Sequence, residues 1–257
     1  AAASADDETV ILNAAREPEI ADLADFLCSC GAHISGAGSG EITVCGMKKL
    51  HSAEHTVIPD RIIASTYMAA AAVTGGDVRI LDTRAEHITP VIPVFEQAGC
   101  KVDCGENSVH ILAPVRLRSV QTVRTMPYPG FPTDMNPQIG VLLCLAKGVS
   151  VLTEGVWDNR FRYVEELKRM GANISVDGAT AIFEGGSQLS AAPVKAVDLR
   201  AGVAMIIAGL AANGRTEIDD IHYIERGYDD IVGKLRAVGA DIKKVMIPSP
   251  ASFEKAN

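Results

Sequence analysis

The stretch Leu167-Lys168-Arg169-Met170-Gly171-Ala172-Asn173-Ile174 ends a helical pattern on a glycine and then enters a strand-like run. Three further stretches have the same form, around Gly31, Gly99 and Gly239. The four glycines are 68, 72 and 68 residues apart. Glycine at a helix end adopts the left-handed conformation that lets the chain turn back. The spacing therefore predicts a repeat protein with units of about 70 residues.

A second, more apolar helix belongs to each repeat and begins near Asp60, Asp134 or Asp198. Helices that are apolar on nearly all sides must be buried, so we expect them at the centre with sheets outside. The fold class is therefore α/β. The expected strands are Thr9–Asn13, Glu41–Val44, Asp77–Leu81, Ser108–Leu112, Val149–Thr153, Thr180–Glu184 and Arg215–Ile218.

Composition excludes several classes of function. A chain of 257 residues with 47% hydrophobic residues can bury a large core. The net charge of -8 argues against nucleic acid as a partner. No apolar run reaches the ~18 to 20 residues of a membrane helix, so no membrane insertion is expected. Six cysteines do not make a disulfide scaffold in a chain of this size, which favours a cytoplasmic location.

The segment Pro127–Asp134 reads Pro-Tyr-Pro-Gly-Phe-Pro-Thr-Asp. Three prolines and a glycine exclude a helix interior or a central strand, so we expect a stiff loop. The loop delivers Asp134 to the start of the apolar run Ile139–Ala146. An aspartate there is either a helix cap or a working group, and we interpret Asp134 as a working group.

Charged residues recur in the loops that precede the helices. Equivalent loops of a repeat fold emerge at the same end, so these residues could converge on one face. Helix N-termini and arginines together would suit an anion there. Taken singly, each aspartate is more often a cap and each arginine more often solvated. The residues are Glu17, Asp60, Arg61, Asp134, Arg160, Asp198, Arg200 and Arg226.

Two motifs are discounted. His51-Ser52-Ala53-Glu54-His55 matches a metalloprotease pattern, but that pattern needs a long helix and this stretch is a short linker before Pro59. No metal is expected. Gly36-Ala37-Gly38-Ser39-Gly40 resembles a phosphate loop but leads into a strand, so we interpret it as a hairpin turn.

Six ordered motifs together resemble the UDP-N-acetylglucosamine 1-carboxyvinyltransferase family, over about Thr9 to Val245. The resemblance implies an inside-out α/β barrel of repeated units, the enolpyruvyl transferase fold, truncated at the N-terminus. It implies residues 1–58 as the last unit of a first domain, 59–246 as a second domain of three units and 247–257 as a tail. The motifs are Asn13–Ile20, Pro59–Ile62, Pro129–Met135, Asn159–Phe161, Asp198–Ala201 and Arg226–Tyr228.

The resemblance also implies a reaction. The enolpyruvyl group of phosphoenolpyruvate would move to the 3-hydroxyl of UDP-N-acetylglucosamine, with release of phosphate and without a cofactor. This would be the first committed step of peptidoglycan synthesis in the cytoplasm, which links the protein to cell wall biogenesis, cell shape, the cell cycle and cell division. Asp134 would be the general base, Arg226 would clamp phosphoenolpyruvate and Glu17 would assist proton transfer. The implied substrate contacts are Asp60, Asp134, Val156, Arg160, Asp198, Arg200 and Arg226.

Some residues depart from the family pattern. Ile63 and Ser65 replace an acid and a glycine, Asn136-Pro137 replaces Gln-Ala, and Tyr163 stands where histidine is usual. The family's first stretch, with its Lys-Asn pair and reactive cysteine loop, is not in this sequence. We therefore expect this chain alone to lack catalysis, and a partner chain to cover the apolar surface left by truncation. The alternatives are a non-catalytic binding or scaffold protein of the same fold, or a relative of the shikimate-pathway enolpyruvyl transferase.

Overall fold

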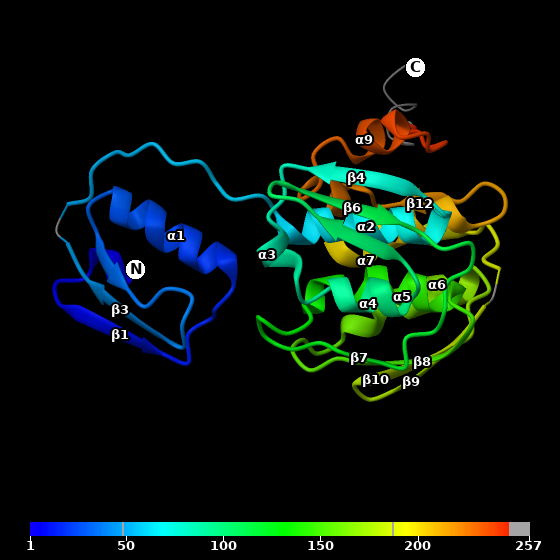
Figure 1. The fold of residues 1–257 in the computed structure, drawn as a ribbon, viewed down its shortest axis with the longest axis horizontal. Coiled ribbons are helices and arrows are strands. Elements are labelled where there is room, and N and C mark those ends of the chain that lie inside the picture. The colour runs from blue at the N-terminus through cyan, green and yellow to red at the C-terminus, as the bar shows by residue number, and fades with distance from the viewer. Residues whose placement is uncertain (48, 187, 247–257) are drawn as a thin grey trace, which may run out of the picture.

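A computed structural model describes residues 1–47, 49–186 and 188–246, so the expected tail 247–257 lies outside the described residues. The chain forms a smaller and a larger lobe joined by an extended linker (Figure 1). In the smaller lobe the strands pair antiparallel in the order β1-β3-β2. The elements of this lobe are η1 (Ala2–Ser4), β1 (Glu8–Leu12), α1 (Pro18–Ser29), β2 (His33–Ser35) and β3 (Glu41–Cys45).

The glycine-rich stretch between β2 and β3 is a hairpin turn, as expected. Gly36 has a φ of 78°, and its carbonyl accepts a hydrogen bond from the Ser39 amide at 3.0 Å. A β-carbon at Gly36 would lie 2.2 Å from the Glu41 carbonyl oxygen. The turn therefore requires glycine for its backbone conformation and for its close approach to the next strand.

Three apolar helices form the centre of the larger lobe, which confirms the expectation drawn from their composition. They are α2 (Arg61–Thr74), α5 (Asn136–Leu145) and α7 (Leu199–Ala211), and each packs against the other two. Nine of the ten residues of α5 are buried. The sheets lie outside the helices, with β4 and β6 on one side and β7–β10 on the other (Figure 1).

The outer layer consists of three separate sheets, and no closed barrel forms among the described residues. The first sheet contains β4 (Asp77–Leu81), β6 (Ser108–Leu112) and β5 (Lys101–Cys104), in that order. The second has the order β7 (Thr122–Arg124), β8 (Gly148–Thr153), β10 (Thr180–Gly185), β9 (Ile174–Asp177). The third pairs β11 (Pro193–Lys195) with β12 (Glu217–Asp219). The barrel implied by the resemblance is therefore an open arrangement of sheets around a helical core.

Short helices complete the units. These are α3 (Ala85–Ile88), α4 (Ile92–Gln97), η2 (Thr133–Met135), η3 (Arg160–Tyr163), α6 (Val164–Arg169), α8 (His222–Glu225) and α9 (Ile231–Ala237). The four repeat glycines all have φ values between 91° and 100°, which confirms the turn that defined the repeat. Sequence reasoning missed β7 and β11, each only three residues long and each parallel to the strand that follows the next apolar helix.

The two lobes have separate buried clusters. One contains Ala3, Ala32, Ile42 and Val44, and the other runs from Ile62 to Leu235. Residues 46–60 form neither helix nor strand where they are described, so the His51–His55 motif lacks the helix that a zinc site of that pattern needs. A boundary at 58/59 stays our proposal, and these separate clusters support it.

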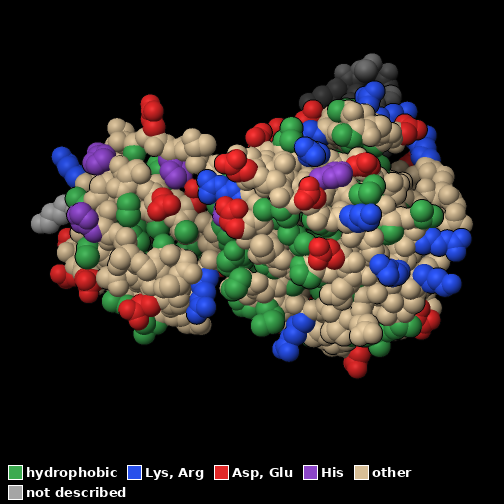
Figure 2. Space-filling view, in the orientation of Figure 1, with side chains coloured by type: hydrophobic (Ala, Val, Ile, Leu, Met, Phe, Trp, Pro, Cys, Tyr) green, Lys and Arg blue, Asp and Glu red, His purple; other side chains and the backbone are tan. Residues whose placement is uncertain are grey.

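The lobes meet at a narrow waist where charged side chains of both signs gather (Figure 2). Arg61 of α2 donates two hydrogen bonds to the Glu19 carboxylate of α1, at 3.2 and 2.9 Å. The Arg61 guanidinium also lies 5.4 Å from the centre of the Tyr128 ring. Arg61 therefore contacts both the smaller lobe and the proline-rich loop.

Candidate functional site

The proline-rich loop is a closed, stiff structure, as its sequence predicts. The Met126 amide donates to the Phe131 carbonyl at 2.9 Å, and the Gly130 amide donates to the Pro127 carbonyl at 2.8 Å. A β-carbon on Gly130 would lie 2.4 Å from the Met126 β-carbon, so only glycine fits the crossing. The loop leads directly into η2, which carries Asp134.

Asp134 lies between two arginines. Its Oδ1 accepts a hydrogen bond from Arg160 Nη2 at 3.0 Å, and its Oδ2 accepts from Arg200 Nε and Nη2 at 3.1 and 2.9 Å. The arginine side chains are only 10% and 15% exposed, whereas the Asp134 side chain is 37% exposed. The two cations are held in the protein while the carboxylate stays open to a ligand.

Each arginine has a second anchor. Arg160 Nε donates to Thr133 Oγ1 at 3.0 Å, and Arg200 Nη1 donates to the Tyr228 hydroxyl at 3.2 Å. The Tyr228 and Thr66 hydroxyls lie 2.9 Å apart, and Gln138 Nε2 donates to Thr66 at 3.1 Å. This chain of contacts joins α2, α5 and the third unit, so all three repeats position the Asp134–Arg200 pair.

Burial is the largest single influence on the pKa of both Tyr228 and Arg200, but it sets the net direction only for Tyr228. It raises the pKa of Tyr228, and the lowering effects of Arg200 and Thr66 do not cancel it. For Arg200, burial alone would lower the pKa, but Tyr228 and Asp134 together raise it above its ordinary value. Arg200 is therefore cationic and Tyr228 a neutral hydroxyl across the physiological range.

The structure uses Asp60 and Asp198 as helix caps. Asp60 Oδ1 accepts from the Ile62 and Ile63 amides at 2.7 and 3.0 Å, and Asp198 Oδ1 accepts from the Ala201 amide at 2.8 Å. Asp60 is also close enough to Tyr228 to raise its pKa. A substrate contact by either aspartate stays a prediction.

Arg226 and Glu17 lie outside the ion-paired cluster. Arg226 follows α8, is exposed and has no ion pair within the described part of the chain. It lies two residues before Tyr228, in the same loop that holds Arg200. Glu17 precedes α1, and its Oε2 is buried without a hydrogen-bond partner among the described residues. Convergence is therefore directly visible for Asp134, Arg160 and Arg200.

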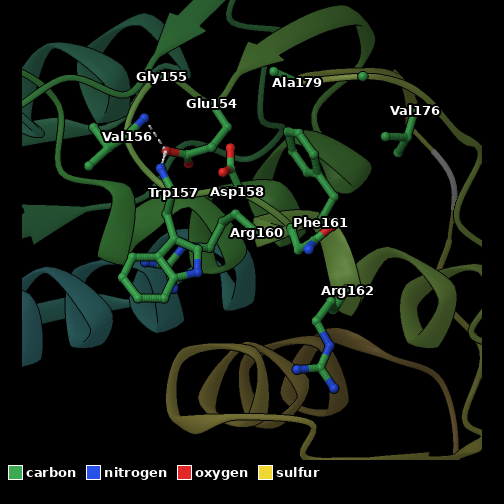
Figure 3. Close-up of a pocket in the computed structure, with 12 residues that line it drawn as sticks. Glu154, Gly155, Val156, Trp157, Asp158, Arg160, Phe161, Arg162, Val176 and Ala179 are labelled. Carbon is green, nitrogen blue, oxygen red and sulfur yellow. Dashed lines mark hydrogen bonds between the residues drawn. The ribbon is translucent and has the colours of Figure 1, made fainter.

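Val156 belongs to a turn, Gly155–Trp157, beside a cavity of about 570 Å³. The Val156 and Trp157 amides donate to Glu154 Oε1 at 2.9 and 3.0 Å (Figure 3). The Arg160 guanidinium lies 5.6 Å from the centre of the Trp157 ring, and Val176 and Ala179 line the far side of the cavity (Figure 3). The cavity therefore shares Arg160 with the Asp134 site.

Sequence reasoning assigned no role to Glu154, Thr66, Gln138 or Tyr228. Glu154 is 7% exposed, and its position at the end of an apolar strand was the only available signal. Of the family departures, Ser65 is buried and donates to the Arg61 carbonyl at 2.7 Å, while Ile63 is partly buried against the core.

Metal sites and membrane-spanning helices are absent from the part of the chain that the structure describes. No group of three or more His, Cys, Asp or Glu side chains there could hold a metal ion. None of the helices described is long and apolar enough to cross a bilayer. The six cysteines all lie within the described residues and are free thiols.

The fold and the repeat define a class of protein. Residues 1–235 match the family described as EPSP synthase (3-phosphoshikimate 1-carboxyvinyltransferase), and the chain belongs to this family. The enolpyruvyl transferase NikO from Streptomyces tendae superimposes with a TM-score of 0.87 at 28% identity, over 96% of this chain and 59% of that one. An EPSP synthase from Acinetobacter baumannii, 21% identical with a TM-score of 0.74, shares the fold over 94% of this chain and 59% of its own.

Curated relatives point to one branch of the family. A protein named UDP-N-acetylglucosamine 1-carboxyvinyltransferase from Halothermothrix orenii is 50% identical over 245 residues, 95% of this chain and 59% of the relative. UDP-N-acetylglucosamine 1-carboxyvinyltransferase 2 of Caldanaerobacter subterraneus is 48% identical over 246 residues, 96% of this chain and 59% of the relative. The resemblance expected from the motifs is confirmed, and the chain spans 59% of the length of these relatives.

Proposed function

We propose that this chain is part of an enzyme that transfers the enolpyruvyl group of phosphoenolpyruvate to the 3-hydroxyl of UDP-N-acetylglucosamine. The observation that carries the proposal is the partly exposed Asp134 carboxylate held between Arg160 and Arg200. A carboxylate with fixed geometry can accept a hydroxyl proton. Arginines beside it can bind the phosphate and carboxylate groups of the other substrate.

In the proposed reaction the sugar hydroxyl oxygen bonds to C2 of phosphoenolpyruvate while Asp134 takes the hydroxyl proton. As this bond forms, the C2–C3 double bond opens and C3 accepts a proton; the bond between C2 and the phosphate oxygen then breaks, phosphate leaves, C3 loses a proton and the double bond is restored. Arg226, exposed and free of ion pairs in the described structure, suits the phosphate of phosphoenolpyruvate. Glu17 would exchange a proton with the methylene carbon. No step requires a cofactor.

The choice of UDP-N-acetylglucosamine as the acceptor rests on the names of the most similar relatives reported above. Proteins named for transfer to UDP-N-acetylglucosamine are 48–50% identical to this chain, whereas the solved EPSP synthases are 21–22% identical. We therefore place the reaction in peptidoglycan synthesis, hence in cell wall formation, cell shape and division, and in the cytoplasm, where free thiols persist. Asp60, Asp198 and Val156 would line the substrate side of the cleft.

The test is phosphate release from phosphoenolpyruvate with UDP-N-acetylglucosamine as acceptor. Because the chain spans 59% of its relatives, we expect little or no turnover by the 257 residues alone. Turnover is expected when the remaining N-terminal part of the Halothermothrix orenii relative is fused to the chain or added in trans. Activity with 3-phosphoshikimate instead would assign the chain to the shikimate branch. A folded chimera inactive with both acceptors would favour the scaffold alternative.

A further inference from the structure

Two of the departures from the family pattern contact each other in the interior. Tyr163 and Asn136 are both 0% exposed, and the Tyr163 hydroxyl donates to Asn136 Oδ1 at 2.8 Å. The resemblance implies glutamine in place of Asn136 and histidine in place of Tyr163. Asparagine is one methylene shorter than glutamine, and a phenol reaches farther than an imidazole. The longer side chain of Tyr163 therefore makes up for the shorter side chain of Asn136, and the two still meet in a hydrogen bond.

Gly140, one turn along α5 from Asn136, provides the space for the phenol. A β-carbon at Gly140 would lie 2.5 Å from the Tyr163 hydroxyl oxygen and 2.8 Å from its ring. Contacts below 3.0 Å would force the ring to move, and in a close-packed core it has no free space to move into. The hydroxyl of Tyr163 is thus accommodated because position 140 has no side chain.

The contacts continue from Asn136 to Glu154. Asn136 Nδ2 donates to Glu154 Oε2 at 2.8 Å, while Glu154 Oε1 accepts from Thr125 Oγ1 at 2.6 Å. A carboxylate can only accept hydrogen bonds, so the Asn136 amide must face it with nitrogen and face Tyr163 with oxygen. The direction of donation is therefore fixed from Tyr163 to Asn136 to Glu154.

The same carboxylate holds the turn that lines the cavity. Glu154 Oε1 accepts from the Val156 and Trp157 amides, and Thr125 Oγ1 accepts from the Gly155 amide at 2.8 Å. All three amides of Gly155–Trp157 therefore donate to two side chains, whereas the residues Val156 and Trp157 are 45% and 62% exposed. The backbone of the turn is fixed from inside, and its side chains face outward.

We propose that Tyr163, Asn136 and Glu154 act as one positioning unit that sets the Gly155–Trp157 turn, with Tyr163, Asn136 and Gly140 as a mutually compensating set. The ordering of the turn is independent of the proposed function. Its consequence for ligand binding, through Val156 and Arg160, rests on that function. We treat the three residues of the unit as positioning residues, because Tyr163 and Asn136 are fully buried and the Glu154 oxygens already accept hydrogen bonds from the protein.

The test is amide hydrogen exchange in the 257-residue chain, read at Val156 and Trp157 and compared with amides of the buried helix α7. Removing the Tyr163 hydroxyl in Tyr163→Phe leaves Asn136 Oδ1 without its donor. We expect about a tenfold loss of protection at the turn, the size expected for one buried hydrogen bond, and a smaller change in α7. Trp157 is the only tryptophan, so its fluorescence anisotropy should fall as well.

Tyr67→Phe is the matched control, because Tyr67 is a partly buried tyrosine of α2 whose hydroxyl has no hydrogen bond within the described residues. It should leave the exchange at Val156 and Trp157 unchanged. Asn136→Gln and Tyr163→His should each loosen the turn, and the double variant should restore protection to within about threefold. Equal loss of protection in the turn and in α7, or no rescue in the double variant, would overturn the proposal.

A second experiment measures the effect of the positioning unit on substrate binding, as KM, in the active chimera. Tyr163→Phe should raise the KM for UDP-N-acetylglucosamine while kcat changes little, because the base Asp134 is untouched. An unchanged KM would limit the unit to ordering the turn and overturn its role in binding. Failure of the proposed function has a different signature, since the unsubstituted chimera would then show no turnover while the exchange results stand.

Discussion

Asp60, Asp134 and Asp198 occupy equivalent positions at the mouths of the three apolar helices, yet the structure uses them in two ways. Asp60 and Asp198 accept hydrogen bonds from amides of the first helical turn. Asp134 has no such bond and is held by Arg160 and Arg200. Of the three equivalent aspartates, Asp134 alone does not cap its helix, so its carboxylate is available for another role.

The start of α5 explains the difference. Asp134 lies within the short helix η2 and not at the N-cap of α5, which begins two residues later at Asn136 and has Pro137 in its first turn. Proline lacks an amide hydrogen, so α5 has one fewer donor to satisfy. In α2 and α7 the aspartate directly precedes the helix and caps it. A carboxylate at the start of a helix is therefore free to act as a reactive group when the helix does not require it as a cap.

The largest expected effect comes from removing the released carboxylate. Asp134→Asn in the active chimera should lower kcat by about 10²- to 10⁴-fold, the usual contribution of a general base. Asp60→Asn is the matched change at a capping position. It should leave kcat within about threefold because asparagine caps a helix as well as aspartate does, and the loss of a substrate contact there would raise KM instead. Phosphate release measures both, and equal losses would show that the two positions do not differ in function.

The second prediction concerns the buried carboxylate that contacts the first residue of α5. Burial is the largest influence on Glu154 and would raise its pKa, but hydrogen bonds from Thr125, the Trp157 and Val156 amides and Asn136 together lower it below 4.5. A carboxyl whose pKa is lower in the folded than in the unfolded state stabilises the fold above the unfolded pKa. That stabilisation is lost as the pH falls below about 4.5 through the folded pKa.

Glu154→Gln should therefore lower the free energy of unfolding at pH 7 by about 1.5–3 kcal/mol, the range for hydrogen bonds to a charged group. The difference from the unsubstituted chain should shrink as the pH falls below 4.5. Urea unfolding at pH 7, 5 and 3.5 measures it, with the exposed Glu165→Gln as the control. A difference that is constant with pH would contradict the lowered pKa.

The third prediction tests the two aspartates that remain caps. Asp60→Ala and Asp198→Ala should each lower the free energy of unfolding by about 1 kcal/mol, because amides of the first turn lose their acceptor. Asp134→Ala loses no cap but leaves Arg160 and Arg200 without their acceptor, so its cost should vanish in an Arg160→Met/Arg200→Met background, where Asp60→Ala and Asp198→Ala should still cost about 1 kcal/mol. Urea unfolding with the three alanine variants would detect the difference, and a capping cost at all three sites would remove the distinction between them.

The sequence predicted the starts of the three helices well, because an aspartate before an apolar run is a local signal. It could not tell which aspartate is released, because that depends on Arg160 and Arg200, which lie 26 and 66 residues farther along the chain. Glu154 and Tyr228 were missed for the same reason. The role of Glu154 depends on Thr125 and Asn136, 29 and 18 residues earlier in the chain, and that of Tyr228 depends on Thr66 and Arg200, 162 and 28 residues earlier. The place of Glu154 at the end of an apolar strand was the only local signal. The strands β7 and β11 were too short to show an alternating pattern.

The smallest expected effect belongs to Arg61, which follows the capping Asp60 and pairs with Glu19 of the smaller lobe. Arg61 is 10% exposed and Glu19 55%, so solvent screens the pair from one side. Burial alone would raise the pKa of Glu19, but the hydrogen bond from Arg61 helps to bring it below its ordinary value. Glu19→Gln should lower the free energy of unfolding by about 0.2–1 kcal/mol, and 1 M salt should reduce the difference. The exposed Glu96→Gln is the control, because Glu96 has no ion pair among the described residues. A loss above about 2 kcal/mol that salt does not affect would mean that the waist between the lobes is a rigid part of the fold, comparable to the helix mouths.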